Sequence, residues 1–164
     1  MKNLYLIGGP MGVGKTAVAK QLTEKLYPAV FLDGDWCWNA EAMIVTEETK
    51  RMVKDNICHL LNNYIKCSEY HNIIFTWVMH TQDIVDDILN SLNTDDVKVH
   101  VISLIATPRA LTERLEKDIA GGIRQPDIIR RSLERLEHYK GVNSIKIDTT
   151  GLSIDRVSDI IKNL

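Results

Sequence analysis

The eight residues 9–16, Gly-Pro-Met-Gly-Val-Gly-Lys-Thr, constrain the fold of this chain more than any other segment. Glycines so closely spaced predict a tight loop, because glycine adopts backbone conformations that other residues avoid. The apolar run 4–7 comes directly before the loop, and Val18, Leu22 and Leu26 form a helical stripe after it. The segment therefore predicts a strand, a compact loop and a helix in immediate succession.

These eight residues also fit the pattern GxxxxGK[ST], whose chemistry is phosphate binding. A triphosphate needs several backbone N–H groups aimed at it, and a glycine-rich loop that opens a helix can supply them. Lys15 can reach the β- and γ-phosphates, and the Thr16 hydroxyl can ligate Mg²⁺. We expect the nucleotide to contact the loop and the first helical turn, at Gly9, Gly12, Val13, Gly14, Lys15, Thr16 and Ala17.

Short apolar runs alternate with helical stripes along the whole chain. The runs that read as strands are residues 4–7, 30–32, 73–78, 97–105 and 145–147. The first four are apolar nearly throughout, as in a parallel sheet that is covered on both faces. Strands separated by helices predict a single α/β domain over residues 1–164.

Composition excludes several classes of protein. A chain of 164 residues with a net charge of −2 lacks the basic excess of a general nucleic-acid or membrane-surface binder. No apolar run reaches the roughly 18 residues that a membrane span requires. The three cysteines are odd in number and show no CxxC pairing, which favours a reducing compartment. We expect a cytoplasmic monomer or small homo-oligomer that binds neither nucleic-acid polymers nor membranes.

Two carboxylates, Asp33 and Asp35, follow the second predicted strand. Ligands of open α/β sheets bind beyond the carboxyl ends of the strands, where these side chains would lie. Asp33 can hold the Mg²⁺ shell, directly or through a water. Asp35 can accept the proton of an acceptor hydroxyl or orient that hydroxyl. The alternative is that Asp-Gly-Asp is turn chemistry alone.

The remaining candidates for an acceptor site are aromatic or basic. Trp36 follows Asp35, and Trp77 and His80 lie near the end of the third predicted strand. Ligand pockets are mostly apolar and aromatic, although core packing explains the tryptophans equally well. His80 can equally be a helix-capping or surface residue. Arg51 precedes all other arginines of the chain and can meet an anionic acceptor.

The segment from 109 to 135 concentrates basic residues: Arg109, Arg114, Lys117, Arg124, Arg130, Arg131 and Arg135. Phosphoryl transfer needs positive charge around the moving group, and guanidinium groups suit phosphate oxygens. With Gly121-Gly122 as a hinge, we expect a short lid at about 117–132 that closes over ATP, excludes water and brings Arg124 to the reaction. The alternative is a solvated helix face balanced by neighbouring glutamates.

Together these residues resemble the small P-loop kinases: adenylate, shikimate, gluconate and adenylylsulfate kinases. Residues 6–16 and 31–35 are similar to the opening of shikimate and adenylylsulfate kinases. Residues 111–115 are similar to the kinase segment whose arginine, here Arg114, stacks on adenine. Arg124 and Arg135 are similar to the lid arginines that contact phosphates. Residues 147–151, which include Thr149, look like the last strand and the adenine-side loop.

The resemblance implies a three-layer P-loop fold with a five-stranded parallel sheet of order 2-3-1-4-5, and it implies ATP and Mg²⁺. The acceptor side departs from these relatives. No arginine follows Asp35 as in adenylate kinase, and the third strand lacks the glycine triplet of shikimate kinase. Asp118 stands where many relatives have a second lid arginine. The acceptor is therefore left unassigned.

The function that these features predict is ATP-dependent transfer of the γ-phosphoryl group to a small-molecule or nucleotide acceptor, with Lys15, Asp33, Asp35 and Arg124 as the catalytic residues. A non-catalytic or regulatory nucleotide-binding module is the alternative. A GTPase-type switch is disfavoured, because the DxxG pattern at 148–151 lies far from its usual position and no NKxD segment is present.

Overall fold

The computed structural model describes all residues, 1–164, and its centre is a five-stranded parallel sheet of order β2-β3-β1-β4-β5. The order 2-3-1-4-5 is the predicted one, so the predicted fold is confirmed. The strands are β1 (Lys2–Gly8), β2 (Ala29–Asp33), β3 (Asn72–Thr76), β4 (Val97–Ile105) and β5 (Ile145–Asp148).

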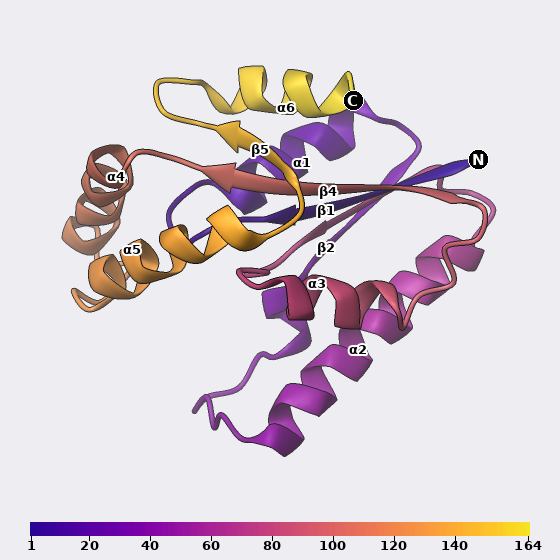
Figure 1. The fold of residues 1–164 in the computed structure, drawn as a ribbon, viewed down its shortest axis with the longest axis horizontal. Helices are drawn as coiled ribbons and strands as arrows, with labels where there is room; N and C mark the ends of the chain where they lie inside the picture. Colours follow the sequence, from indigo (N-terminus) through magenta and orange to yellow (C-terminus); the bar gives the residue numbers. More distant parts are fainter.

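Helices cover both faces of the sheet and one end of it. The α-helices are α1 (Lys15–Lys25), α2 (Glu47–Lys66), α3 (Gln82–Leu89), α4 (Pro108–Ala120), α5 (Ile128–His138) and α6 (Ile154–Lys162). In Figure 1, α1 and α6 lie above the sheet, α2 and α3 lie below it, and α4 and α5 lie at the end where β4 points. The carboxyl ends of the strands therefore face α4 and α5. No helix combines the length and the apolar character needed to cross a membrane.

Successive side chains of β1 point to opposite faces of the sheet, and each face has its own hydrophobic core. Tyr5 and Ile7 pack with α1, α4 and α6 on one face, whereas Leu4 and Leu6 pack with α2 and α3 on the other. Successive strand residues point to opposite faces, so a central strand covered on both sides must be apolar throughout. This burial explains why β1 shows no polar alternation.

Helix starts follow local chemistry. The Thr46 hydroxyl accepts from Thr49 N–H to cap α2, and Thr107 caps α4 ahead of Pro108. The prediction that the third strand continues to Val78 was wrong, because β3 ends at Thr76. Met79 N–H donates to the Trp77 carbonyl at 3.2 Å, which turns the chain away from the sheet.

Core packing on α2 gives a test of the fold. Leu61 is fully buried, whereas Met52 on the same helix is 45% exposed. We expect Leu61→Ala to lower the free energy of unfolding by about 2–5 kcal/mol, because it leaves a cavity. Met52→Ala should change it by no more than about 0.5 kcal/mol. Urea denaturation measures both values, and equal losses would contradict the observed burial.

Candidate active site

The loop between β1 and α1 wraps tightly because of its glycines. Gly12 has φ +82° and Gly14 has φ +102°, a region that side chains disfavour. A Cβ on Gly12 would also lie 2.5 Å from Leu115 Cδ2 of α4. The Lys15 ammonium donates to the carbonyls of Gly9 at 2.8 Å and Pro10 at 3.2 Å. The lysine side chain is thus hydrogen-bonded to the loop that precedes it, at the carboxyl end of β1.

The helix α5 and the 3₁₀ turn η2 (Tyr139–Gly141) that follows it hold this loop from outside. Ser132 Oγ donates to the Met11 carbonyl at 2.6 Å. Gly9 N–H donates to the Tyr139 hydroxyl at 2.9 Å, and Tyr139 is fully buried. The sequence analysis did not identify Ser132 as a residue that contacts the loop. Its spacing of three residues from Arg135 could have indicated this contact, because it places both side chains on one face of the helix.

The Asp33 carboxylate joins the loop to the segment that follows β2. Its Oδ2 accepts from the Thr16 hydroxyl at 2.7 Å, and its Oδ1 accepts from Asp35 N–H at 3.1 Å. The second contact caps the short 3₁₀ helix η1 (Gly34–Cys37), which carries Asp35. One buried carboxylate therefore positions both the hydroxyl of the phosphate loop and the next carboxylate along the chain.

Thr76, at the end of β3, is a site residue that sequence reasoning missed. It pairs in register with Asp33, and its buried hydroxyl has no hydrogen-bond partner. The sequence feature that could have identified it is a polar residue at the end of an otherwise apolar strand. Thr16, Asp33 and Thr76 thus offer two hydroxyls and a carboxylate near one another, and these hard oxygen donors fit Mg²⁺.

Five charged groups influence one another across the site. Burial lowers the pKa of Lys15 to about 8. The Asp35 and Asp33 carboxylates oppose this shift, whereas the Arg124 and Arg135 guanidinium groups add to it. The charges of both carboxylates and of both arginines thus act on the lysine.

Asp35 lies at the rim of the site as an exposed residue whose carboxyl is desolvated only in part. Burial and the Asp33 charge raise the pKa of Asp35, and Lys15, Arg124 and the Trp77 indole N–H oppose this rise. Trp77 closes over η1, since a Cβ on Gly34 would lie 2.6 Å from the indole ring. A carboxylate with a raised pKa is a better proton acceptor near neutral pH.

Residues 117–132 comprise the end of α4, a short connection and the start of α5. Gly121 caps α4, and Gly122 turns the chain with φ +72°. Arg124 Nε donates to Asp118 Oδ2 at 3.0 Å, with both side chains about one-third exposed (34% and 33%). Asp118 therefore orients the arginine that the lid prediction emphasised.

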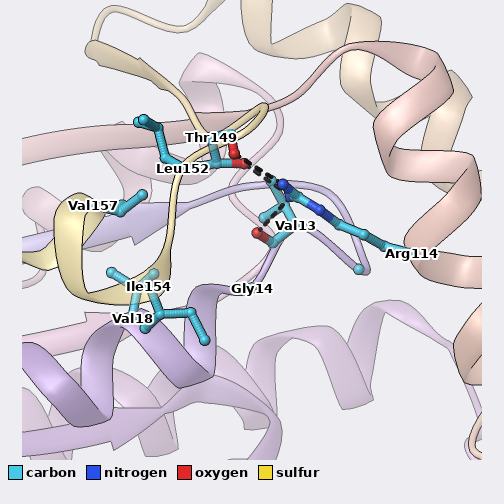
Figure 2. A pocket seen from close by; sticks show the side chains of 9 residues that line it. Val13, Gly14, Val18, Arg114, Thr149, Leu152, Ile154 and Val157 are labelled. Atoms are coloured by element: carbon cyan, nitrogen blue, oxygen red, sulfur yellow. Dashed lines mark hydrogen bonds between the residues drawn. The ribbon is translucent and has the colours of Figure 1, made fainter.

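A cavity of about 200 Å³ lies on the other side of the loop. Arg114 reaches across it from α4 and donates to the Thr149 side-chain and main-chain oxygens, both at 2.9 Å (Figure 2). The opposite wall is apolar and is made of Val18, Leu152, Ile154 and Val157. An apolar wall that faces a guanidinium held by two hydrogen bonds suits an aromatic base.

The other residues predicted to bind an acceptor are Trp36, His80 and Arg51, and their surroundings differ. Trp36 is 57% exposed and packs edge-on against Phe31, with ring centroids 5.1 Å apart. The imidazole rings of His80 and His138 pack edge to face, with their centroids 5.6 Å apart. Burial and the Arg135 charge lower the pKa of His80. Arg51 is exposed on α2, and its charge contributes to lowering the pKa of Glu47.

Comparison with known proteins assigns the chain to a family. The family described as AAA domain matches residues 6–140. The chain therefore belongs to this AAA domain family. A search of curated proteins finds no significant match.

Solved structures show the same fold. The tunicamycin resistance protein of Deinococcus radiodurans is 22% identical with a TM-score of 0.74, covering 99% of this chain and 95% of that one. A gluconokinase from Sinorhizobium meliloti 1021 is 17% identical, with a TM-score of 0.71 and coverage of 96% and 87%. Shikimate kinase from Acinetobacter baumannii is 21% identical, with a TM-score of 0.64 and coverage of 99% and 92%. The resemblance to small P-loop kinases is thereby confirmed for the fold.

Tyr139 provides a test of how the loop is supported. Tyr139→Phe leaves the Gly9 N–H buried without its acceptor, so we expect the free energy of unfolding to fall by about 1–3 kcal/mol. Tyr70→Phe, on an exposed tyrosine, is the matched control and should be neutral. Chemical denaturation of both variants measures the difference. An unchanged stability of Tyr139→Phe would show that the hydroxyl does not support the loop.

Proposed function

We propose that this protein is an ATP-dependent phosphotransferase that moves the γ-phosphoryl group to a hydroxyl of a small acceptor. The observation that carries the proposal is the Asp33 carboxylate, which contacts both Thr16 of the phosphate loop and the backbone of Asp35. A loop suited to ATP and a carboxylate suited to a hydroxyl thereby belong to one electrostatic site.

The reaction needs one bond made and one broken. The acceptor hydroxyl oxygen attacks the γ-phosphorus, the bond from phosphorus to the β,γ-bridging oxygen breaks, and ADP leaves with that electron pair. Asp35 accepts the hydroxyl proton, since burial raises its pKa towards that of a useful base. Lys15, Arg124 and Arg135 offset the negative charge on the phosphoryl oxygens.

The nucleotide is held at both ends in this proposal. The loop N–H groups and Lys15 bind the phosphates, and the cavity beside Arg114 and Thr149 takes the adenine. Thr16 and Asp33, with Thr76 nearby, would hold Mg²⁺, which supplies charge stabilisation at the β- and γ-oxygens when it is bound. Residues 117–132 act as the lid, in which Asp118 orients Arg124 and closure excludes water.

Asp35→Asn tests the assignment of the base. The amide keeps the shape of the side chain but cannot accept the proton, so we expect phosphoryl transfer to fall at least about 100-fold. ADP release from MgATP, measured with a panel of hydroxylated acceptors, reports the loss. ATP affinity should stay within about threefold, because Asp35 does not hold the phosphates. Asp95→Asn, on an exposed residue before β4, is the control.

A different set of three results would support the alternative of a non-catalytic nucleotide-binding module. In that case the wild-type chain would bind ATP, no acceptor of the panel would raise ADP release, and Asp35→Asn would be indistinguishable from wild type.

The pH dependence of ATP binding tests the role of Lys15. Burial lowers the pKa of this ammonium to about 8 in the free protein, so its charge is present below pH 8 and is lost above it. We expect ATP affinity to fall by up to tenfold per pH unit above pH 8, in titrations at constant ionic strength. Lys15→Met should bind ATP more weakly and lack this alkaline fall. Equal wild-type affinity at pH 7 and pH 9.5 would contradict the role.

A further inference from the structure

A second cavity, of about 290 Å³, lies where β4 ends, between α4, α5 and the edge strand β5. We name it the β5-edge cavity. It shares no lining residue with the cavity beside Arg114. Ligand pockets measure about 300–1,000 Å³, so a cavity at the lower end of this range suits a small molecule. Five apolar or aromatic residues and three charged ones line it: Ile105, Ala106, Pro108, Leu136 and Tyr139, with Glu137, Lys140 and Lys146.

The inner wall of the β5-edge cavity belongs to the buried core. Ala106, Leu136 and Tyr139 are each at most 9% exposed, and they come from the end of β4, from α5 and from η2. The Tyr139 hydroxyl accepts from Gly9 N–H, so this wall also supports the phosphate loop. The wall therefore offers an apolar and aromatic surface to the body of a ligand.

The rim of the cavity carries two ammonium groups and one carboxylate, all on exposed residues. Lys140 Nζ pairs with Glu137 Oε2, so these two charges offset each other. The Lys146 ammonium donates to the carbonyls of Val142 and Ser144 and to the Ser144 hydroxyl, all of them neutral oxygens. It forms no ion pair, so one positive charge at the rim is left without a counter-charge.

Charged residues beside the lining in the sequence have other partners. Asp148, two positions after Lys146 on β5, accepts from Thr150 N–H at 2.9 Å. Arg109, at the start of α4, pairs with Glu113 at 2.9 Å. Neither forms an ion pair with Lys146, so an anion from outside the chain can take that place.

We propose that the β5-edge cavity binds a small organic anion, with its carboxylate at Lys146 and an aliphatic or aromatic body against Leu136 and Tyr139. An inorganic anion would leave the apolar wall uncovered, and a neutral molecule would leave the ammonium without a charged partner. The cavity lies apart from the residues assigned to ATP and to the acceptor. The proposal therefore does not rest on the phosphotransferase function.

A matched pair of probes tests the charge of the ligand. 2-Naphthoate and 2-naphthamide have the same aromatic body, but only the first is charged, and neither has a hydroxyl that the proposed reaction could use. Equilibrium dialysis at low ionic strength, with saturating MgADP, keeps the nucleotide cavity and the phosphate loop occupied. We expect naphthoate to bind about twofold to fivefold more tightly, the contribution of one exposed ion pair. Equal affinity for the two probes, or no binding of either, would overturn the proposal.

Two variants with opposite effects locate the anion. Lys146→Met should remove the preference for naphthoate, because it deletes the unpaired ammonium. Glu137→Gln should tighten naphthoate binding by about twofold, because it frees the ammonium of Lys140. Lys66→Met and Glu24→Gln are the matched controls, on exposed residues of α2 and α1 outside the cavity, and should change neither affinity.

Two other results would assign the cavity or the probe differently. A preference for naphthoate that persists in Lys146→Met would show binding at another cationic site, such as Arg114, and would overturn the proposal. A dimer in sedimentation velocity that Lys146→Met dissociates would show a second copy of the chain at the cavity, with the same consequence. We expect neither result.

Discussion

The carboxylate of Asp33 is the interaction on which the site depends. It is buried at the carboxyl end of β2, it accepts from Thr16 with one oxygen, and it accepts from Asp35 N–H with the other. A buried charge is stable only when its hydrogen-bonding capacity is used, and here both partners belong to the proposed chemistry. The geometry between the phosphate loop and Asp35, the proposed base, is therefore fixed by a side chain that need not react.

Support of the phosphate loop comes from far along the chain. Ser132 and Tyr139 bond the backbone of Met11 and Gly9, so α5 and η2 brace the strained turn that the glycines permit. The same helix carries Arg135, and the connection before it carries Arg124. If residues 117–132 form the proposed lid, its movement would be coupled through α5 to the loop of residues 9–16.

Local patterns in the sequence predicted the elements but not the contacts between them. The strand before the loop follows from an apolar run, and the order of the sheet follows from the resemblance to known kinases. The bond from Gly9 to Tyr139 joins residues 130 positions apart, and no local pattern encodes such a pairing. The unpartnered hydroxyl of Thr76 and the β5-edge cavity likewise depend on how elements pack. The end of β3 was misjudged because Trp77 and Val78 are apolar, although the backbone already turns there.

Calorimetric titration of the wild-type protein with ATP, ADP and adenosine, each with and without Mg²⁺, tests the central claim most directly. If the loop, Lys15 and the Thr16–Asp33 pair hold the phosphates, one ATP binds per chain, Mg²⁺ tightens it, and adenosine binds at least about 100-fold more weakly, as the loss of several charge-assisted hydrogen bonds requires. Adenosine affinity equal to that of ATP, or no effect of Mg²⁺, would contradict the claim.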